Sequence, residues 1–140
     1  MTTSQKQETV TKTKIVAEIY KHFSEGNVPA ILELMAEDIH WEYSGGTPGV
    51  PWLTESKGRE STIAFFESLS AIEFIKFEPK EILEGNDVVV GLLDVEFKVN
   101  ATGKTIREID ETHIFKFDSD NKVCGFRHGV DSYKHWEAQW

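Results

Sequence analysis

The sequence contains a single cysteine, Cys124, among 140 residues. One cysteine excludes an internal disulfide, and it excludes zinc sites built from several thiolates. No apolar run approaches the roughly 20 residues that a membrane-spanning helix needs, and the opening MTTSQKQETV is too polar for a signal peptide. We therefore expect a protein of the reducing cytoplasm that makes no contact with membranes.

Basic residues are also in short supply. The 15 Lys and Arg residues stand against 24 Asp and Glu residues, which gives a formal net charge of −9 at pH 7. Binding to nucleic acids or to anionic membranes depends on clustered positive charge, so the composition argues against both. Phosphate loops, dinucleotide fingerprints and HExxH-type or carboxylate–histidine metal patterns are missing as well. We expect no metal ion and no cofactor.

Aromatic residues, in contrast, are plentiful. Nine Phe, four Trp and three Tyr residues supply enough large apolar surface for a sizeable core or a lined cavity. The length fits one domain. We expect residues 1–9 to form a flexible tail and residues 10–140 to form a single domain.

Three segments place apolar residues at the spacing of an amphipathic helix. The first two, separated by Gly26 and Asn27, should form a helical hairpin, and the third opens at Gly58. The inward faces would carry Val16, Ile19, Tyr20 and Phe23, then Val28, Ile31, Leu32 and Met35, then Ile63, Phe66 and Leu69.

The remaining segments predict strands. Alternation or short apolar runs favour strands over residues 39–43, 72–83, 87–99, 104–117 and 122–131. The glycine- and proline-rich segment from Ser44 to Lys57 predicts a long loop. Helices segregated from a mostly antiparallel sheet define an α+β fold. A strongly curved sheet wrapped around three helices would leave a cone-shaped hydrophobic pocket.

The last two strands concentrate the reactive side chains. His113 shares strand parity with Phe115 and Phe117, so it should face the pocket, where a neutral imidazole beside Glu111 suits a general base. Asp131 ends the last strand. It is either a buried pocket acid or the N-cap of a short helix that follows.

Other candidates carry alternatives of their own. Arg127 and His128 are adjacent and should point in opposite directions, so only one faces the cavity. Asp94 lies either at the cavity rim or on a solvated face. Trp41 and Tyr43 share one side of their strand, and Trp52 lies in a loop that could close over the pocket. We expect the remaining histidines at the surface, namely His22, His40 and His135.

Several phrases resemble the SnoaL-like branch of the nuclear transport factor 2-like superfamily, which also includes ketosteroid isomerases. They are GNVPAILELMAEDIHWEY (26–43), GVPWL (49–53), GRESTIAFFESL (58–69), ETHIFKF (111–117) and KVCGFRHGVD (122–131). The resemblance implies a cone-shaped barrel, formed by a strongly curved, mixed but mostly antiparallel sheet around a hydrophobic cavity, commonly in a homodimer.

The resemblance also implies site residues. In SnoaL-type polyketide cyclases, a His and an Asp base on the last two strands correspond to His113 and His128 here. In limonene epoxide hydrolase, two catalytic aspartates correspond to Asp94 and Asp131. Three further positions of that hydrolase site are occupied differently in this chain, by Leu92, Trp41 and Tyr43.

These observations predict a cofactor-free isomerase, cyclase or hydrolase that uses acid–base chemistry on a small hydrophobic carbonyl or ring compound. The expected catalytic residues are His113 and Asp131, with Asp94 and His128 as further candidates. The expected ligand-binding residues are Trp41, Tyr43, Trp52, Phe65, Phe66 and Arg127. The alternatives are a non-catalytic binding protein for small hydrophobic ligands and a dimeric interaction module.

Overall fold

The structure is a computed structural model that describes residues 11–43, 49–53 and 55–140. The expected flexible tail, residues 1–9, lies outside these ranges, and so do residues 44–48 and 54 of the expected loop. None of the helices among the described residues combines the length and the apolar character that crossing a bilayer requires.

The first two described helices begin at polar caps. Helix α2 (Lys12–Ser24) starts after Thr11, whose side chain accepts a hydrogen bond from the Lys14 amide, and α3 (Val28–Glu33) starts after Asn27, which caps Ala30 in the same way. Helix α4 (Arg59–Ser68) runs into the short 3-10 turn η1 (Leu69–Ala71). The buried face of α2 consists of Ile15, Val16, Ile19 and Tyr20.

Within the part of the chain that the structure describes, six strands form one sheet in the order β2-β1-β6-β5-β4-β3. The strands are β1 (Met35–Tyr43), β2 (Ser56–Lys57), β3 (Ile72–Glu84), β4 (Val88–Val99), β5 (Thr105–Phe117) and β6 (Val123–Gly129). Strands β1 and β6 are parallel, and every other neighbouring pair is antiparallel. The second helix was predicted to include Met35, but Met35 pairs with Val123 as the first residue of β1.

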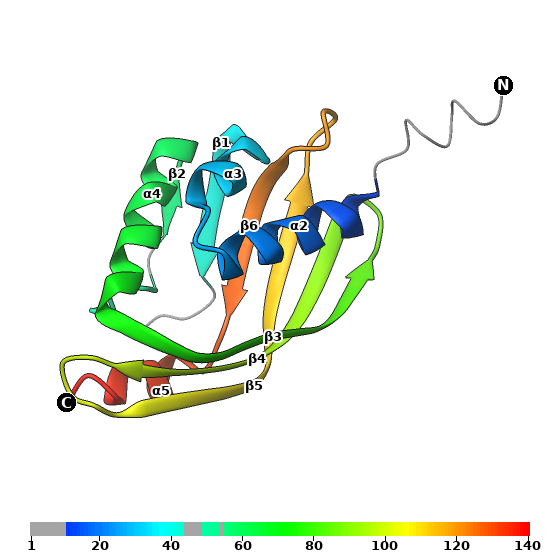
Figure 1. The fold of residues 1–140 in the computed structure, drawn as a ribbon. Helices are drawn as coiled ribbons and strands as arrows, with labels where there is room; N and C mark the ends of the chain where they lie inside the picture. The colour runs from blue at the N-terminus through cyan, green and yellow to red at the C-terminus, as the bar shows by residue number, and fades with distance from the viewer. Residues whose placement is uncertain (1–10, 44–48, 54) are drawn as a thin grey trace, which may run out of the picture.

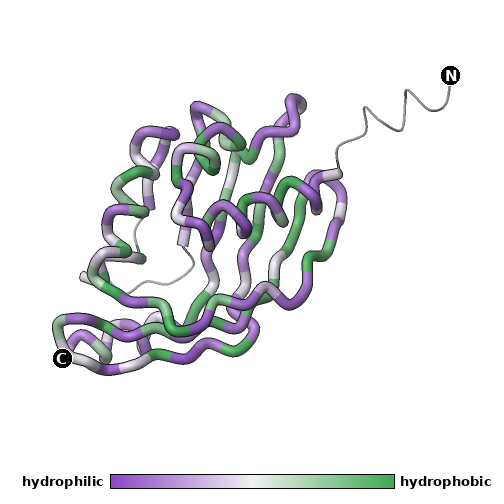
Figure 2. Tube along the Cα trace, viewed as in Figure 1, coloured by the Kyte–Doolittle hydropathy of each residue, from purple (hydrophilic) through white to green (hydrophobic). Residues whose placement is uncertain are grey.

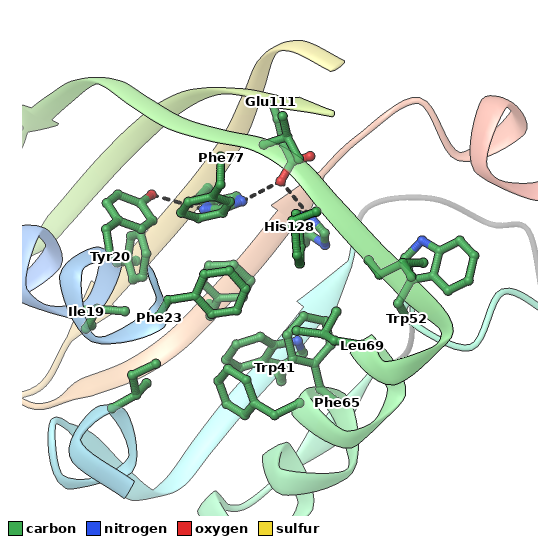
Figure 3. Close-up of a pocket in the computed structure, with 18 of the residues that line it drawn as sticks. Ile19, Tyr20, Phe23, Trp41, Trp52, Phe65, Leu69, Phe77, Glu111 and His128 are labelled. Atoms are coloured by element: carbon green, nitrogen blue, oxygen red, sulfur yellow. Dashed lines mark hydrogen bonds and ion pairs between the residues drawn. The ribbon is translucent and has the colours of Figure 1, made fainter. Parts of the chain in front are cut away.

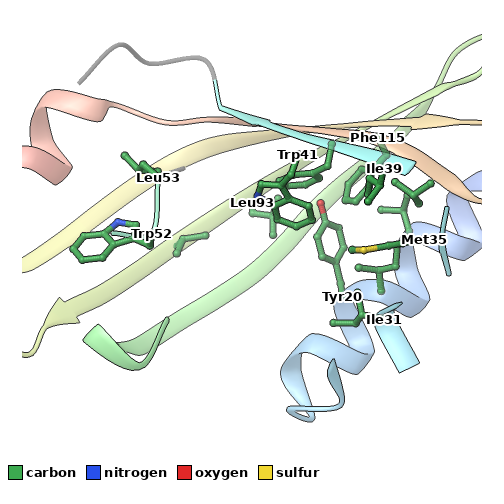
Figure 4. Close-up of a cluster of buried hydrophobic side chains, with 14 of the residues drawn as sticks. Tyr20, Ile31, Met35, Ile39, Trp41, Trp52, Leu53, Leu93 and Phe115 are labelled. Atoms are coloured by element: carbon green, nitrogen blue, oxygen red, sulfur yellow. The ribbon is translucent and has the colours of Figure 1, made fainter. Parts of the chain in front are cut away.

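The predicted α+β fold with a strongly curved, mixed sheet is confirmed, although the sheet stays open between β2 and β3 instead of closing into a barrel. Helices α2, α3 and α4 lie on one side of the sheet (Figure 1). Hydrophilic and hydrophobic residues alternate along the strands (Figure 2). The inward set packs with the helices into one core, which includes Tyr20, Met35, Trp41 and Phe115 (Figure 4).

A bulge in β5 changes which side chains face this core. The β4–β5 register shifts between Leu93 and Val95, and Asp110 has a φ of 60°. Regular alternation would put Glu108 and Glu111 on opposite faces of the sheet. The extra residue lets both carboxyl groups point inward, and each is 6% exposed. Positive φ is tolerated by Asp better than by most residues.

The carboxyl group of Glu108 anchors the C-terminal helix α5 (Ser132–Glu137). Trp52 Nε1 donates to His135 Nδ1 at 2.9 Å, and His135 Nε2 donates to Glu108 Oε2 at 2.8 Å. The Asp131 amide donates to the same oxygen at 3.2 Å. The expectation of a surface position for His135 was therefore wrong: its side chain is 1% exposed, because α5 folds back over the end of β5.

We expect His135→Ala to lower the free energy of unfolding by about 3–5 kcal/mol, since it leaves a buried carboxyl group without its partner. Chemical denaturation measures this change. The matched control is His40→Ala, because the His40 side chain is 62% exposed and its loss should cost less than about 0.5 kcal/mol. Equal losses in the two variants would contradict the anchoring role of His135.

Candidate active site

A cavity of about 80 Å³ lies between the inner face of the sheet and the helices. This volume exceeds the roughly 10–15 Å³ that one water molecule requires. Among the lining residues that the structure describes there is no Lys or Arg, and the polar ones are Glu111, His113, His128 and His135 alongside the phenol of Tyr20. The aromatic lining is formed by Tyr20, Phe23, Trp41, Trp52, Phe65, Phe66, Phe74, Phe77, Phe97, Phe115 and Phe126.

The cavity wall carries a continuous chain of hydrogen bonds from α2 to β6 (Figure 3). The Tyr20 hydroxyl lies 3.0 Å from His113 Nδ1, and His113 Nε2 lies 2.7 Å from Glu111 Oε2. His128 Nε2 reaches the same carboxylate oxygen at 2.9 Å. We call Tyr20, Glu111, His113 and His128 the polar cluster.

Strand register brings the polar cluster together. His113 and His128 are directly opposite each other on β5 and β6, and Glu111 precedes His113 by two residues on the same inward face. Tyr20 reaches them from the buried face of α2. Gly91 on β4 is opposite His113, and a Cβ atom at Gly91 would overlap the Tyr20 hydroxyl. The missing side chain of Gly91 therefore makes room for the phenol.

The charge state of the polar cluster follows from burial and hydrogen bonding. Burial opposes ionisation of Glu111, but the hydrogen bonds from His113 and His128 outweigh it and hold the pKa of this carboxyl well below its usual range. Burial lowers the pKa of His113 despite the carboxylate beside it. Burial also raises the pKa of Tyr20 above its ordinary value of 10.0. A neutral phenol and a neutral His113 therefore adjoin an ionised Glu111.

These charge states assign the protons and separate the roles of the two histidines. An ionised carboxylate only accepts hydrogen bonds, so both Nε2 atoms donate to Glu111. The Nδ1 atom of His113 then accepts from Tyr20, which commits both of its ring nitrogens and makes His113 a positioning residue. His128 contacts the same carboxylate oxygen through Nε2 at 2.9 Å and lines the cavity from β6.

The structure places six of the ten predicted site residues in the cavity wall, namely His113, His128, Trp41, Trp52, Phe65 and Phe66. Of the two adjacent residues Arg127 and His128, only one was expected to face the cavity, and the structure shows that it is His128. Arg127 is instead exposed, donates to Glu42 at 2.9 Å and does not line the cavity, which corrects its predicted position. Tyr43 packs beside the core without lining the cavity, which corrects its predicted position.

The two aspartates predicted as catalytic lie outside the cavity. Asp131 is the N-cap of α5, where its side chain accepts from the Lys134 amide at 3.2 Å. This is the alternative that the sequence left open. Asp94 faces the outer side of the sheet, where it forms an ion pair with Lys80 at 2.8 Å and accepts from the Asp110 amide at 3.2 Å. Both contacts are structural, and the predicted His113–Asp131 pair does not form.

Sequence reasoning missed two members of this arrangement. Tyr20 was assigned only to the apolar face of a helix, yet a buried phenol needs a hydrogen-bond partner, and that requirement was a usable signal. Glu111 was considered an accessory to His113, whereas it is the centre to which both histidines bind.

The fold and the cavity together define an α+β protein with a pocket on the inner face of a curved sheet. A match to the SnoaL-like domain extends over residues 16–126, and the chain belongs to this family. Curated proteins give no match.

Solved structures confirm the NTF2-like fold at low sequence identity. An NTF2-like protein from Burkholderia pseudomallei is 18% identical with a TM-score of 0.79, and the alignment covers 92% of this chain and 98% of that one. TerC, co-crystallised with polyporic acid, is 19% identical with a TM-score of 0.76 and coverages of 91% and 97%. A protein from Mesorhizobium loti described as a SnoaL-like polyketide cyclase is 16% identical with a TM-score of 0.69 and coverages of 85% and 98%.

We expect Gly91→Ala to destabilise the protein by about 1–3 kcal/mol, because the new methyl group displaces the Tyr20 phenol from His113. Thermal and chemical unfolding measure the loss. Gly125→Ala is the matched control, since its Cβ would meet the Lys116 side chain at an ordinary contact distance of 3.4 Å. If Gly125→Ala cost as much as Gly91→Ala, the close approach of Tyr20 would not be the cause.

The lowered pKa of His113 predicts that stability falls on acidification. Below the ordinary histidine pKa of 6.5, His113 is protonated in the unfolded chain but stays neutral in the folded protein until a lower pH is reached. The stabilisation is therefore complete above that pH and is lost as the pH falls toward the folded-state pKa, by at most about 1.4 kcal/mol per pH unit for one proton. The lowered pKa of Glu111 acts in the same direction below its ordinary value of 4.5.

Denaturant unfolding at a series of pH values tests this. His113→Gln, whose amide can still bond to Tyr20 and Glu111, should show a shallower dependence between about pH 6.5 and 5. His40→Ala should keep the slope of the unmodified protein. A slope unchanged in His113→Gln would show that another group titrates.

Proposed function

We propose that this protein is a cofactor-free enzyme that moves a proton on a small hydrophobic carbonyl or ring compound, in an isomerisation, cyclisation or hydration. The observation that carries the proposal is the carboxylate–histidine pair, Glu111 and His128, at the wall of an aromatic cavity. One oxygen of the Glu111 carboxylate accepts hydrogen bonds from His113 at 2.7 Å and from His128 at 2.9 Å.

His128 is the general base in this proposal. Its imidazole would remove a proton from a carbon next to the ligand carbonyl. The imidazolium formed in this way is stabilised by Glu111, and it returns the proton to a different atom of the ligand or to its leaving group. His113 and Tyr20 hold the Glu111 carboxylate in place, which fixes the orientation of the base.

The remainder of the cavity supports an apolar ligand. Its walls are aromatic rings from α2, α4, β1 and the four strands that follow along the sheet, and no Lys or Arg is present among its described lining residues to bind a carboxylate or a phosphate. A structural neighbour described as a polyketide cyclase and another co-crystallised with polyporic acid are consistent with a ligand of this type.

A second function, ligand binding without catalysis, is favoured by one specific observation. Both nitrogens of His113 and the shared oxygen of Glu111 are already engaged within the protein. In that case the polar cluster would serve as a wall of the cavity and would not transfer protons to the ligand.

Proton exchange in D₂O tests catalysis directly. We expect the protein to accelerate exchange of the α-protons of a hydrophobic ketone from a panel that includes cyclohexanone and propiophenone, followed by NMR. His128→Gln and Glu111→Gln should each lower the rate by about 10²–10⁴-fold, the usual contribution of a general base. Arg127→Gln and Asp131→Asn should leave it unchanged, because both side chains lie outside the cavity.

Loss of exchange in Asp131→Asn with retention in His128→Gln would overturn the assignment of the base. A ketone that raises the melting temperature in a concentration-dependent way without any exchange would favour the binding protein instead.

A further inference from the structure

Three members of the polar cluster have a second chemical capability. Glu111, His113 and His128 each offer one metal-ligating atom, and these atoms lie within 4.8 Å of one another. Two imidazole nitrogens and one carboxylate oxygen form a ligand set typical of zinc and of other borderline divalent transition metals. Hard cations such as Mg²⁺ and Ca²⁺ prefer all-oxygen sites and fit it poorly.

The existing geometry is close to that of a metal site. Both Nε2 atoms already point at Glu111 Oε2, at 2.7 and 2.9 Å. Around a tetrahedral zinc ion with bonds of about 2.0–2.1 Å, the ligand atoms are roughly 3.3 Å apart. To admit the ion, each histidine nitrogen therefore needs to move away from the carboxylate oxygen by about half an ångström. The two histidine nitrogens, which lie within 4.8 Å of each other, also need to approach one another.

The protons can be rearranged without leaving the protein. A histidine that coordinates through Nε2 must carry its proton on Nδ1. For His113 the partner of that proton is already present, because the Tyr20 hydroxyl lies 3.0 Å from Nδ1 and can accept as well as donate. Tyr20 would thereby fix the metal-binding tautomer, as outer hydrogen-bond partners of zinc-bound histidines do. Glu111 is already ionised and has no proton to lose.

We propose that Glu111, His113 and His128 bind one divalent transition metal ion such as Zn²⁺, with a further coordination position open to the aromatic cavity that all three residues line. The ion binds Nε2 of His128, whose proton moves to Nδ1, and it also takes the carboxylate oxygen that orients this histidine. The metal-bound state and the proton-transfer state of the proposed enzyme therefore exclude each other, so zinc would be an inhibitor of the proton transfer.

Metal titration of the full chain, after treatment with EDTA and its removal, tests this proposal. Isothermal titration calorimetry with Zn²⁺ near neutral pH should give one ion per chain, and Co²⁺ should give the visible absorption of a low-coordinate site. His128→Ala and Glu111→Gln should weaken binding at least about tenfold, and Tyr20→Phe should weaken it by about 10–100-fold. His40→Ala, which removes an exposed histidine, should bind like the unmodified protein.

Absence of one-to-one binding would overturn the proposal, and so would binding that survives in His128→Ala and Glu111→Gln. Circular dichroism melts establish that each variant is folded. Tyr20→Phe removes only a hydroxyl group, so it keeps the test decisive if a histidine variant does not fold.

The ketone-exchange assay, carried out in EDTA, separates this proposal from the proposed function. If the protein catalyses exchange but does not bind zinc, only the proposed metal site is contradicted. If it binds zinc but never catalyses exchange, only the proposed enzymatic function is contradicted.

Discussion

The ionised carboxylate of Glu111, buried in a cavity of aromatic rings, is the constraint on which the site depends. A buried charge is costly unless donors surround it, and here two histidines converge on one oxygen. The need for these donors accounts for His113 and His128 facing each other across β5 and β6. The hydroxyl of Tyr20 forms a hydrogen bond with the second ring nitrogen of His113, and Gly91 leaves the space for the phenol. The burial of one charge thus accounts for residues on four elements, namely α2, β4, β5 and β6.

Strand β5 carries two carboxylate–histidine arrangements that differ in what surrounds them. Glu108 binds His135, whose other nitrogen is taken by Trp52, so that group fastens α5 and the segment around Trp52 to the sheet. Glu111 binds two histidines at the wall of the cavity. Similar residues therefore anchor a helix in one arrangement and line the cavity in the other. The bulge at Asp110 makes this possible by turning both carboxyl groups inward.

Alternation and helical spacing predicted the elements and the inward face of β5, including His113, Phe115 and Phe117, because those patterns are local. Asp131 failed as a pocket acid because a six-residue helix begins after it and takes its side chain as a cap. The inward orientation of Glu108 could not be predicted from alternation, because a bulge at Asp110 reverses the parity of β5. The Tyr20–His113 contact joins α2 to β5, and no local pattern specifies such a pair. The family resemblance supplied the fold and named His128 among its positions, but not the carboxylate behind it.

The parallel pairing of β1 with β6 has a consequence for how the chain is made. Strand β1 leaves the ribosome early and at first has only the two-residue strand β2 beside it. Its other edge must wait for β6, which is synthesised after every other strand of the sheet. Trp41 and Phe126, which face each other across this pairing, therefore meet late. During synthesis the aromatic face of the N-terminal half is uncovered, and this is the period in which the nascent protein is most exposed to aggregation.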